Sequence, residues 1–176
     1  IVFANAGING VWAPIEELTP DEWNRTIQVN LTGCFLTIKY AVPFLKRQGG
    51  SIIVTSSING TRTFSNSGAV AYSRAKAGQS VMARMLAPEL APHGVRINAI
   101  CPGSVRTNII ENTEQRNRQS IRWPVEFPKG HIPLTGKTPA DPDQIAQLVL
   151  FLASDQSSFI TGSEIHIDGA QSLVIG

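Results

Sequence analysis

Apolar side chains recur at steps of three or four residues over positions 20–48. This spacing places them on one face of an α-helix, and the set is Trp23, Ile27, Leu31, Phe35, Ile38, Val42 and Leu45. Thr19 is a suitable N-cap, Pro20 suits the first helical position, and Gly49-Gly50 ends the pattern. The pattern predicts one long amphipathic helix over residues 20–48.

Continuous runs of β-branched and apolar residues indicate strands. Residues 51–57, Ser-Ile-Ile-Val-Thr-Ser-Ser, precede Asn59-Gly60 and predict a buried strand that delivers hydroxyl groups at its end. Residues 1–4 and 95–100 are apolar runs of the same kind.

Two more helices are expected between and after these strands. One begins near Val70 and ends at Pro92-His93-Gly94, and the other begins at Asp141-Pro142, a cap followed by a proline, and ends near Ser154. Strands and helices that alternate without hairpin turns predict a parallel sheet with helices on both faces, an α/β fold.

Composition agrees with one globular domain: 176 residues, of which 42% are hydrophobic and 16% charged. The formal net charge is +2 and the basic residues are scattered, so no nucleic-acid partner is expected. The longest apolar stretch, residues 145–153, is far shorter than the about 20 residues that a membrane span requires. We therefore expect no membrane partner.

The cysteines and histidines do not form a ligand pattern. Cys34 and Cys101 stand alone, and His93, His131 and His166 have no ligand spacing with each other or with the cysteines. No metal site is therefore expected. Lone cysteines without CxxC spacing favour a reducing, cytoplasmic location.

Tyr72 and Lys76 indicate the chemistry. Residues four apart on a helix share one face, so the Lys76 ammonium should lie beside the Tyr72 phenol. A neighbouring cation lowers the pKa of a phenol from about 10 toward the range useful for acid/base exchange. Ser57, at the carboxyl end of the strand over residues 51–57, would reach the same edge of an open α/β sheet.

These residues belong to a series of motifs that resembles the short-chain dehydrogenase/reductase family. Asn5-Ala6-Gly7 follows the first strand, Asn30 lies in Val-Asn-Leu, Ser57 ends a strand, and Tyr72 and Lys76 open a helix. Further along come Arg96-Ile-Asn98, then Pro102-Gly103-Ser-Val105-Arg-Thr107, and Phe159-Ile-Thr-Gly162 before a strand over residues 164–168. The resemblance covers Ile1 to about Ala170 and implies a Rossmann-like, doubly wound parallel sheet.

The resemblance also implies a role for each residue. Tyr72 would be the general acid/base that exchanges a proton with a ketone or alcohol, and Lys76 would lower its pKa and bind the nicotinamide ribose. Ser57 would orient the substrate oxygen. Asn30 would kink its helix, as the matching family residue does, and so hold a water that links Lys76 to solvent. In isolation, Ser57 could merely end a strand and Asn30 merely cap a helix turn.

Hydride transfer requires a nicotinamide cofactor, because no amino-acid side chain supplies a hydride. The family binds NAD or NADP. The matching contacts are Asn5, Ala6 and Gly7 near the adenosine ribose, and Pro102, Gly103, Val105 and Thr107, with Tyr72 and Lys76, around the nicotinamide.

The glycine-rich turn that binds the cofactor phosphates in this family is absent from residues 1–176. We therefore expect residues 1–176 to form the catalytic, C-terminal portion of a single NAD(P)-binding domain. The expected activity of the whole protein is the interconversion of a secondary alcohol and a ketone.

Residues 109–137 lack a regular pattern and are expected to cover a small-molecule substrate. Trp123 and Phe127 could line an apolar pocket there. Arg116, Arg118, Arg122 and Lys129 could meet an anionic substrate, although such a charge run is usually a solvated surface.

Two alternatives stay open. Sugar epimerases and dehydratases of the wider superfamily also use a tyrosine and a lysine, although they append a substrate domain. A catalytically silent assembly module is the second, because the two helices over residues 20–48 and 70–92 resemble those that form the main dimer interface of the family. A homo-oligomer, dimer or tetramer, is expected in either case.

Overall fold

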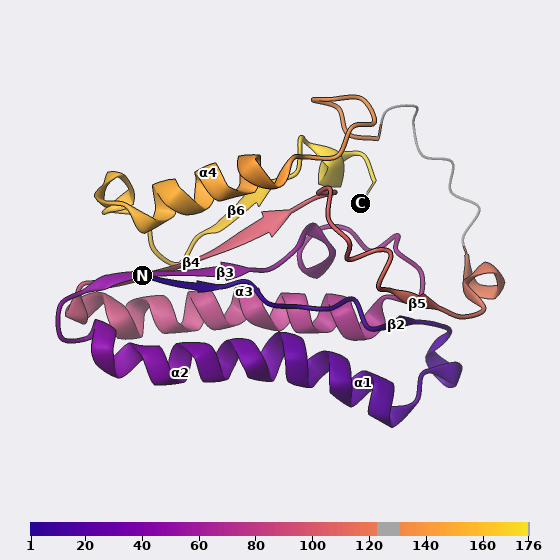
Figure 1. The fold of residues 1–176 in the computed structure, drawn as a ribbon, viewed down its shortest axis with the longest axis horizontal. Coiled ribbons are helices and arrows are strands. Elements are labelled where there is room, and N and C mark those ends of the chain that lie inside the picture. Colours follow the sequence, from indigo (N-terminus) through magenta and orange to yellow (C-terminus); the bar gives the residue numbers. More distant parts are fainter. Residues whose placement is uncertain (123–130, 176) are drawn as a thin grey trace.

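The computed structural model describes residues 1–122 and 131–175. Four parallel strands form its main sheet: β1 (Val2–Ala4), β3 (Gly50–Thr55), β4 (Val95–Pro102) and β6 (Glu164–Ile167), in the order β1-β3-β4-β6. Helices cover both faces of this sheet, which confirms the expected Rossmann-like arrangement (Figure 1).

Two helical layers enclose the sheet. The helices α1 (Pro20–Ile27), α2 (Gly33–Leu45) and α3 (Val70–Leu90) lie on one face, and α4 (Pro142–Ala153) lies on the other (Figure 1). Short 3-10 helices complete the described chain: Ile15–Glu17, Ile58–Gly60, Ala91–His93, Arg118–Ile121, Asp155–Ser157 and Gln171–Leu173.

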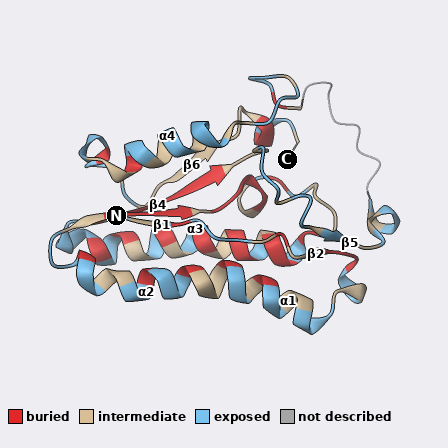
Figure 2. Ribbon diagram, in the orientation of Figure 1, coloured by how far each residue is buried: buried red, intermediate tan, exposed pale blue. Residues whose placement is uncertain are grey.

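Alternate strand residues supply the two cores, because successive side chains of a strand point to opposite faces. Ile52, Val54 and Ile97 pack toward α2 and α3, whereas Ile53 and Ile100 pack against Leu152 of α4. Both faces of β3 and β4 are therefore buried (Figure 2).

The capping predictions are confirmed. Thr19 accepts a hydrogen bond from the Glu22 amide while the Glu22 side chain accepts one from the Thr19 amide, and Asp141 forms the same capping box with Gln144. Each cap fixes where its helix leaves the preceding loop.

The single helix expected over residues 20–48 is interrupted. Between α1 and α2 the chain forms a π-helix, Gln28–Thr32, which contains Asn30. The apolar face continues through this turn, so the side-chain pattern does not reveal the change in backbone hydrogen bonding.

The strand pair β2 (Val11–Trp12) and β5 (Glu114–Gln115) forms a second, parallel sheet that the sequence pattern did not predict. It joins the loop after β1 to the segment expected to cover the substrate. Trp123, Phe127 and Lys129, named for that segment, lie outside the described residues.

Candidate active site

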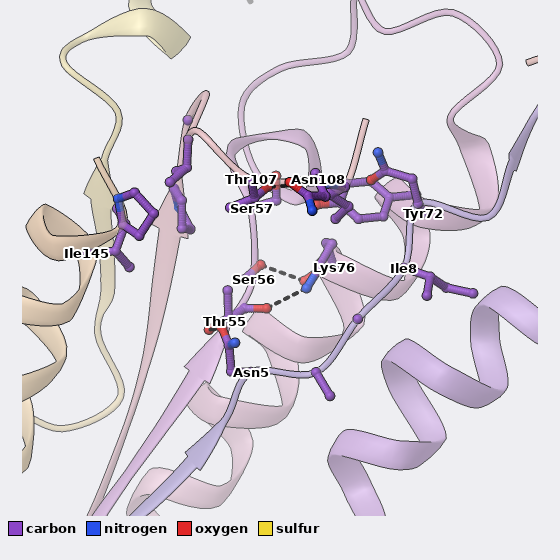
Figure 3. Close-up of a pocket in the computed structure, with 18 of the residues that line it drawn as sticks. Asn5, Ile8, Thr55, Ser56, Ser57, Tyr72, Lys76, Thr107, Asn108 and Ile145 are labelled. Atoms are coloured by element: carbon purple, nitrogen blue, oxygen red, sulfur yellow. Dashed lines mark hydrogen bonds between the residues drawn. The ribbon is translucent and has the colours of Figure 1, made fainter. Parts of the chain in front are cut away.

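A pocket of about 610 Å³ opens at the carboxyl ends of β1, β3 and β4. Ten of the eleven residues expected to contribute to catalysis or cofactor binding line it: Asn5, Ala6, Gly7, Ser57, Tyr72, Lys76, Pro102, Gly103, Val105 and Thr107. Figure 3 shows that they come from separate loops and from the first turns of α3. The sheet edge therefore brings together residues that are up to a hundred positions apart.

Lys76 is fixed at the floor of this pocket. Its side chain is 3% exposed, and its Nζ donates a hydrogen bond to the Thr55 carbonyl at 2.6 Å (Figure 3). The same Nζ lies 5.7 Å from the centroid of the Tyr72 ring. Since Thr55 ends β3, this bond ties the helix that carries Tyr72 to the strand that precedes Ser57.

Burial determines the protonation of both groups. It raises the pKa of the Tyr72 phenol, with a hydrogen bond from Ser57 acting in the opposite direction. It lowers the pKa of Lys76 to about 8, opposed by the nearby Cys34 and Cys101 thiols. The pKa of Tyr72 therefore lies above its ordinary value, because desolvation of the phenol outweighs the hydrogen bond with Ser57, and the lowering expected from Lys76 stays a prediction.

Ser57, and not Ser56, faces the phenol. The Ser57 hydroxyl accepts a hydrogen bond from the Asn59 amide at 3.1 Å and lies within hydrogen-bonding range of Tyr72. The Ser56 hydroxyl instead donates to the Lys76 carbonyl at 2.8 Å and accepts from Ser80 at 2.9 Å. Ser56 also lines the pocket, but its hydroxyl is engaged in connecting β3 to α3, whereas the Ser57 hydroxyl is the one beside Tyr72.

Gly60 permits the close approach that places Ser57. A Cβ at this position would lie 2.6 Å from the Ala77 amide nitrogen and 2.6 Å from the Lys76 carbonyl carbon. The 3-10 turn Ile58–Gly60 therefore packs directly on the backbone of α3, one residue beyond Lys76.

Asn30 is the one expected catalytic residue that does not line the pocket. It is fully buried, and its side-chain amide holds the backbone of Ile8 at both polar atoms: Oδ1 accepts from the Ile8 amide and Nδ2 donates to the Ile8 carbonyl, each at 2.8 Å. It lies directly behind Gly7, since a Cβ there would be 3.1 Å from Asn30 Oδ1 and 3.5 Å from Lys76 Nζ. Asn30 Oδ1 and Lys76 Nζ therefore both border the small space that a side chain at residue 7 would occupy.

Asn5 also forms a hydrogen bond inside the protein: its Oδ1 accepts from the Thr55 hydroxyl at 2.9 Å. This bond links the loop after β1 to the end of β3.

Further residues line the pocket: Asn9 and Asn108 escaped the sequence prediction, whereas Ile109 and Asn112 belong to the segment over residues 109–137 that was expected to cover the substrate. Asn9, Asn108, Ile109 and Asn112 line the wall opposite the strands. Asn9 is buried and donates to the Thr113 hydroxyl at 2.8 Å. Only the nearness of Asn9 and Asn108 to Asn5-Ala6-Gly7 and to Thr107 in the sequence could have indicated them, because isolated amides carry no periodic signal.

Two of the three arginines proposed to meet an anionic substrate, Arg116 and Arg118, contact other groups of the protein. Arg116 binds both carboxylate oxygens of Glu22 at 3.0 and 2.9 Å, and Arg118 donates to the Ser67 carbonyl and lies over the Trp12 ring. These contacts attach residues 114–118 to the protein, so in this structure the two guanidinium groups hold the segment that follows the pocket residues Ile109 and Asn112.

Within the described ranges, 1–122 and 131–175, no cluster of three or more His, Cys, Asp or Glu side chains has the arrangement of a metal site. In the same ranges no helix has the length and apolar character needed to cross a membrane.

Known proteins are similar to this chain in sequence and in fold. The family model described as "Enoyl-(Acyl carrier protein) reductase" matches residues 1–170. Trans-4-hydroxycyclohexanecarboxylate dehydrogenase of Sinomonas cyclohexanicum is 40% identical over 171 residues, which are 97% of this chain and 60% of that protein.

Two solved structures extend the comparison. A 3-ketoacyl-ACP reductase from Sinorhizobium meliloti 1021 has a TM-score of 0.93 and 51% identity, covering 98% of this chain and 68% of that one. A 3-oxoacyl-[acyl-carrier protein] reductase from Brucella melitensis, with bound NAD, has a TM-score of 0.78 and 33% identity, covering 96% and 60%. This chain thus spans about three fifths to two thirds of the length of these relatives.

The family match, the parallel sheet and the convergence of Ser57, Tyr72 and Lys76 on one pocket agree. The chain belongs to the short-chain dehydrogenase/reductase family.

Proposed function

We propose that this chain carries the catalytic part of an NAD(P)-dependent oxidoreductase that interconverts a secondary alcohol and a ketone. The observation that supports this most directly is the pocket in which a buried phenol, a hydroxyl and an ammonium meet: Tyr72, Ser57 and Lys76. A carbonyl oxygen bound there can receive a proton from one group while a second group orients it. The names of two relatives contain a hydroxy acid and a ketoacyl group, the two oxidation states of this reaction.

Tyr72 is the proposed general acid/base. Because burial raises the pKa of its phenol, the proton stays on the oxygen at neutral pH, which suits donation to a developing alkoxide in the direction of ketone reduction. The Ser57 hydroxyl, held by the Asn59 amide, would bind the same substrate oxygen. In alcohol oxidation, Tyr72 would accept the proton.

Lys76 would sustain this exchange. With a pKa of about 8 it is mostly protonated at neutral pH, so it stabilises negative charge near the phenol and retains donors for a ribose hydroxyl. Asn30, immediately behind Gly7, would connect Lys76 to solvent through a water.

The cofactor would supply the hydride. The residues present suit the ribose and nicotinamide part of a dinucleotide. Gly7 leaves open the space beside Lys76 Nζ that a side chain at residue 7 would occupy. The residues proposed to hold it are Asn5, Ala6, Gly7, Pro102, Gly103, Val105 and Thr107, together with Tyr72 and Lys76. The NAD bound to the Brucella melitensis relative supports this assignment.

We also propose that the protein is a homo-oligomer, a dimer or tetramer, that forms through α2 and α3. A cytoplasmic location is proposed from the unpaired cysteines, both of which are free and buried in the structure.

The test of the catalytic proposal joins this chain to the N-terminal segment of the Sinorhizobium meliloti reductase that it does not match. Binding of NADH and NADPH is titrated by fluorescence, and turnover is measured on a panel of ketones and secondary alcohols. We expect Tyr72→Phe to lower kcat by about 10²–10⁴-fold with little change in nucleotide affinity, because it removes only the exchangeable proton. Tyr40→Phe, at the other tyrosine of the chain, is the matched control.

Each alternative predicts a different outcome. A folded hybrid that binds neither nucleotide would support the silent assembly module. Conversion of a sugar substrate without net change in nicotinamide absorbance would support an epimerase or dehydratase. Equal turnover by Tyr72→Phe and Tyr40→Phe would exclude Tyr72 as the acid/base.

A further inference from the structure

Gln79 is a polar side chain in a position where helix periodicity calls for an apolar one. It follows Lys76 by three residues on the inward face of α3, and it is 1% exposed. Burying an amide costs free energy unless both of its polar atoms find partners. The Gln79 Oε1 atom is buried and has none within the described part of the chain. A methionine would fill a similar volume without an unpaired acceptor, so packing alone does not explain the amide.

The other end of this amide contacts the site. Gln79 Nε2 donates a hydrogen bond of 2.7 Å to the backbone carbonyl of Asn30, within the core of the protein. Asn30 belongs to the π-helix Gln28–Thr32, in which backbone carbonyls are displaced from the regular α-helical register. Gln79 therefore satisfies a buried carbonyl at the one turn where the helix departs from α geometry.

The Asn30 side chain transmits this placement to the pocket. It forms hydrogen bonds with both the amide and the carbonyl of Ile8, and Ile8 lines the pocket with Asn5, Ala6 and Gly7. A displacement of the π-helix would distort these two hydrogen bonds. It would therefore move the loop over residues 5–9, which faces Lys76. The contacts run in one direction: Gln79 to the Asn30 carbonyl, then the Asn30 side chain to Ile8.

We propose that Gln79 is a positioning residue of the active site, whose amide donor fixes the π-helix so that Asn30 can hold the loop over residues 5–9. Its effect on catalysis rests on the proposed function. Its effect on the Asn30–Ile8 hydrogen bonds is independent of the proposed function. The positioning role and the proposed function can therefore fail separately.

The first experiment measures hydrogen exchange in the 176-residue chain. In the wild type, one proton of the Gln79 side-chain amide should exchange slowly in ¹H–¹⁵N spectra, because it is buried and bonded to a carbonyl. The Ile8 amide should also be protected. Rapid exchange of both Gln79 side-chain protons in a folded chain would overturn the proposal without any variant.

Two variants of similar size then separate the donor from packing. Gln79→Met has no donor, and Gln79→Glu has one only when its carboxyl group is protonated. At pH 7.5 we expect Ile8 exchange to accelerate about tenfold in both variants, relative to core amides of β3 such as Val54, since the buried Asn30 carbonyl loses the Gln79 donor. On lowering the pH toward 5, and after correction for intrinsic exchange rates, protection should return in Gln79→Glu and not in Gln79→Met.

Asn98→Leu is the matched control. Asn98 is a fully buried amide whose Nδ2 donates to the Ile160 carbonyl at 2.8 Å, on β4 and away from the pocket. The variant Asn98→Leu should destabilise the fold without selectively accelerating exchange of the Ile8 amide. Equal Ile8 protection in Gln79→Met and wild type, or equal loosening in Asn98→Leu, would refute a positioning role.

The catalytic consequence is measured in the hybrid enzyme. Gln79→Met should lower kcat about tenfold and shift the pH dependence of kcat. The KM for the ketone should change by a smaller factor than kcat. A hybrid without any turnover would count against the proposed function only, because the exchange data would still decide whether Gln79 positions Asn30.

Discussion

Lys76 shows how one buried charge links stability to pH. Its pKa falls from 10.5 to about 8 on folding because burial disfavours the ammonium. Between these two values the unfolded chain binds a proton that the folded chain does not, so the contribution of Lys76 to stability rises with pH. Below pH 8 both states hold the proton and the contribution is constant.

We therefore expect wild type to gain stability relative to Lys76→Met between pH 8 and 10, on the order of 2 kcal/mol. Urea unfolding of both proteins at several pH values measures the difference. Lys39→Met, at an exposed lysine of α2, controls for the loss of a positive charge. A difference between wild type and Lys76→Met that stays flat from pH 7 to 10 would contradict the buried, desolvated lysine.

Gly60 allows a second prediction for a single residue. A Cβ 2.6 Å from two backbone atoms of α3 cannot be accommodated by a side-chain rotation, so the turn that carries Ser57 must move away. Gly60→Ala should lower the free energy of unfolding by about 1–3 kcal/mol and reduce turnover of the hybrid. Chemical unfolding and steady-state kinetics measure both.

Gly33→Ala is the control for Gly60→Ala. Its Cβ would meet only the Gln28 carbonyl at 3.5 Å, an ordinary contact, at the first residue of α2. Alanine favours a helix over glycine, so this variant should be neutral or slightly stabilising. Similar losses in the two variants would mean that the close approach at Gly60 does not limit the site.

At the scale of elements, the pair β2 and β5 holds the pocket wall in place. The Arg116 amide donates to the Trp12 carbonyl at 2.9 Å, and its guanidinium donates to the Glu17 carbonyl and forms a two-point pair with Glu22. This pair lowers the pKa of Glu22 to about 2. Because Glu22 also completes the capping box of α1, one carboxylate fixes both the helix start and the wall.

Loss of this arginine should loosen the wall. In Arg116→Met we expect amides of residues 113–118 to exchange several-fold faster and the hybrid KM for its ketone to rise, because the fork-shaped hydrogen bonds are lost. Arg116→Lys should recover only part of the effect, since an ammonium cannot form the two-point pair. Unchanged exchange in Arg116→Met would show that the strand pairing alone holds the segment.

The pH dependence of this contact follows from the depressed pKa of Glu22. Its stabilising contribution is present above about pH 4.5 and is lost as the pH falls toward 2. Exchange of residues 113–118 should therefore accelerate on acidification in wild type more than in Arg116→Met.

The sequence predicted elements better than it predicted their junctions. Apolar periodicity located α3 and α4 and the strands β3 and β4, because burial on one or two faces imposes a pattern. It could not reveal the π-helix at Asn30, since that turn preserves the apolar face and changes only backbone bonds. It also missed β2 and β5, whose two-residue pairing depends on long-range contacts rather than local pattern.

The same division applies to the site. The motif residues Ser57, Tyr72 and Lys76 could be named because they belong to a series of short local motifs that resembles the short-chain dehydrogenase/reductase family. The direction in which the pKa of Tyr72 shifts could not be predicted from the sequence, because it depends on how much water the surrounding protein excludes. The function of Gln79 was likewise invisible, since its partner is 49 residues away.

At the scale of the whole molecule, β3 and β4 are buried on both faces, whereas several large apolar side chains of α2 and α3 are exposed. Tyr40 and Phe44 on α2 are 66% and 64% exposed, and Met85 on α3 is 70% exposed. Figure 2 shows exposed stretches along the outer side of α2. Exposed apolar side chains of this kind are typical of a protein–protein interface and support the proposed homo-oligomer.

A charge placed in this surface should dissociate the oligomer. We expect Phe44→Glu and Met85→Glu each to shift the mass of the hybrid toward the monomer, because a carboxylate in an apolar interface is desolvated without a partner. Sedimentation equilibrium measures the mass, and circular dichroism confirms that the fold is retained. Ile15→Glu is the control, since Ile15 is 64% exposed but lies outside α2 and α3.

The two helix variants also separate assembly from catalysis. Tyr72 and Lys76 are buried in the first turns of α3, whereas Met85 lies more than two turns further along and is exposed. A monomeric variant that keeps its turnover would show that the pocket is complete within one chain. Loss of turnover together with loss of assembly would mean that packing between copies of α3 helps to hold Tyr72 in place. An oligomer that persists in both variants would place the interface elsewhere on the molecule.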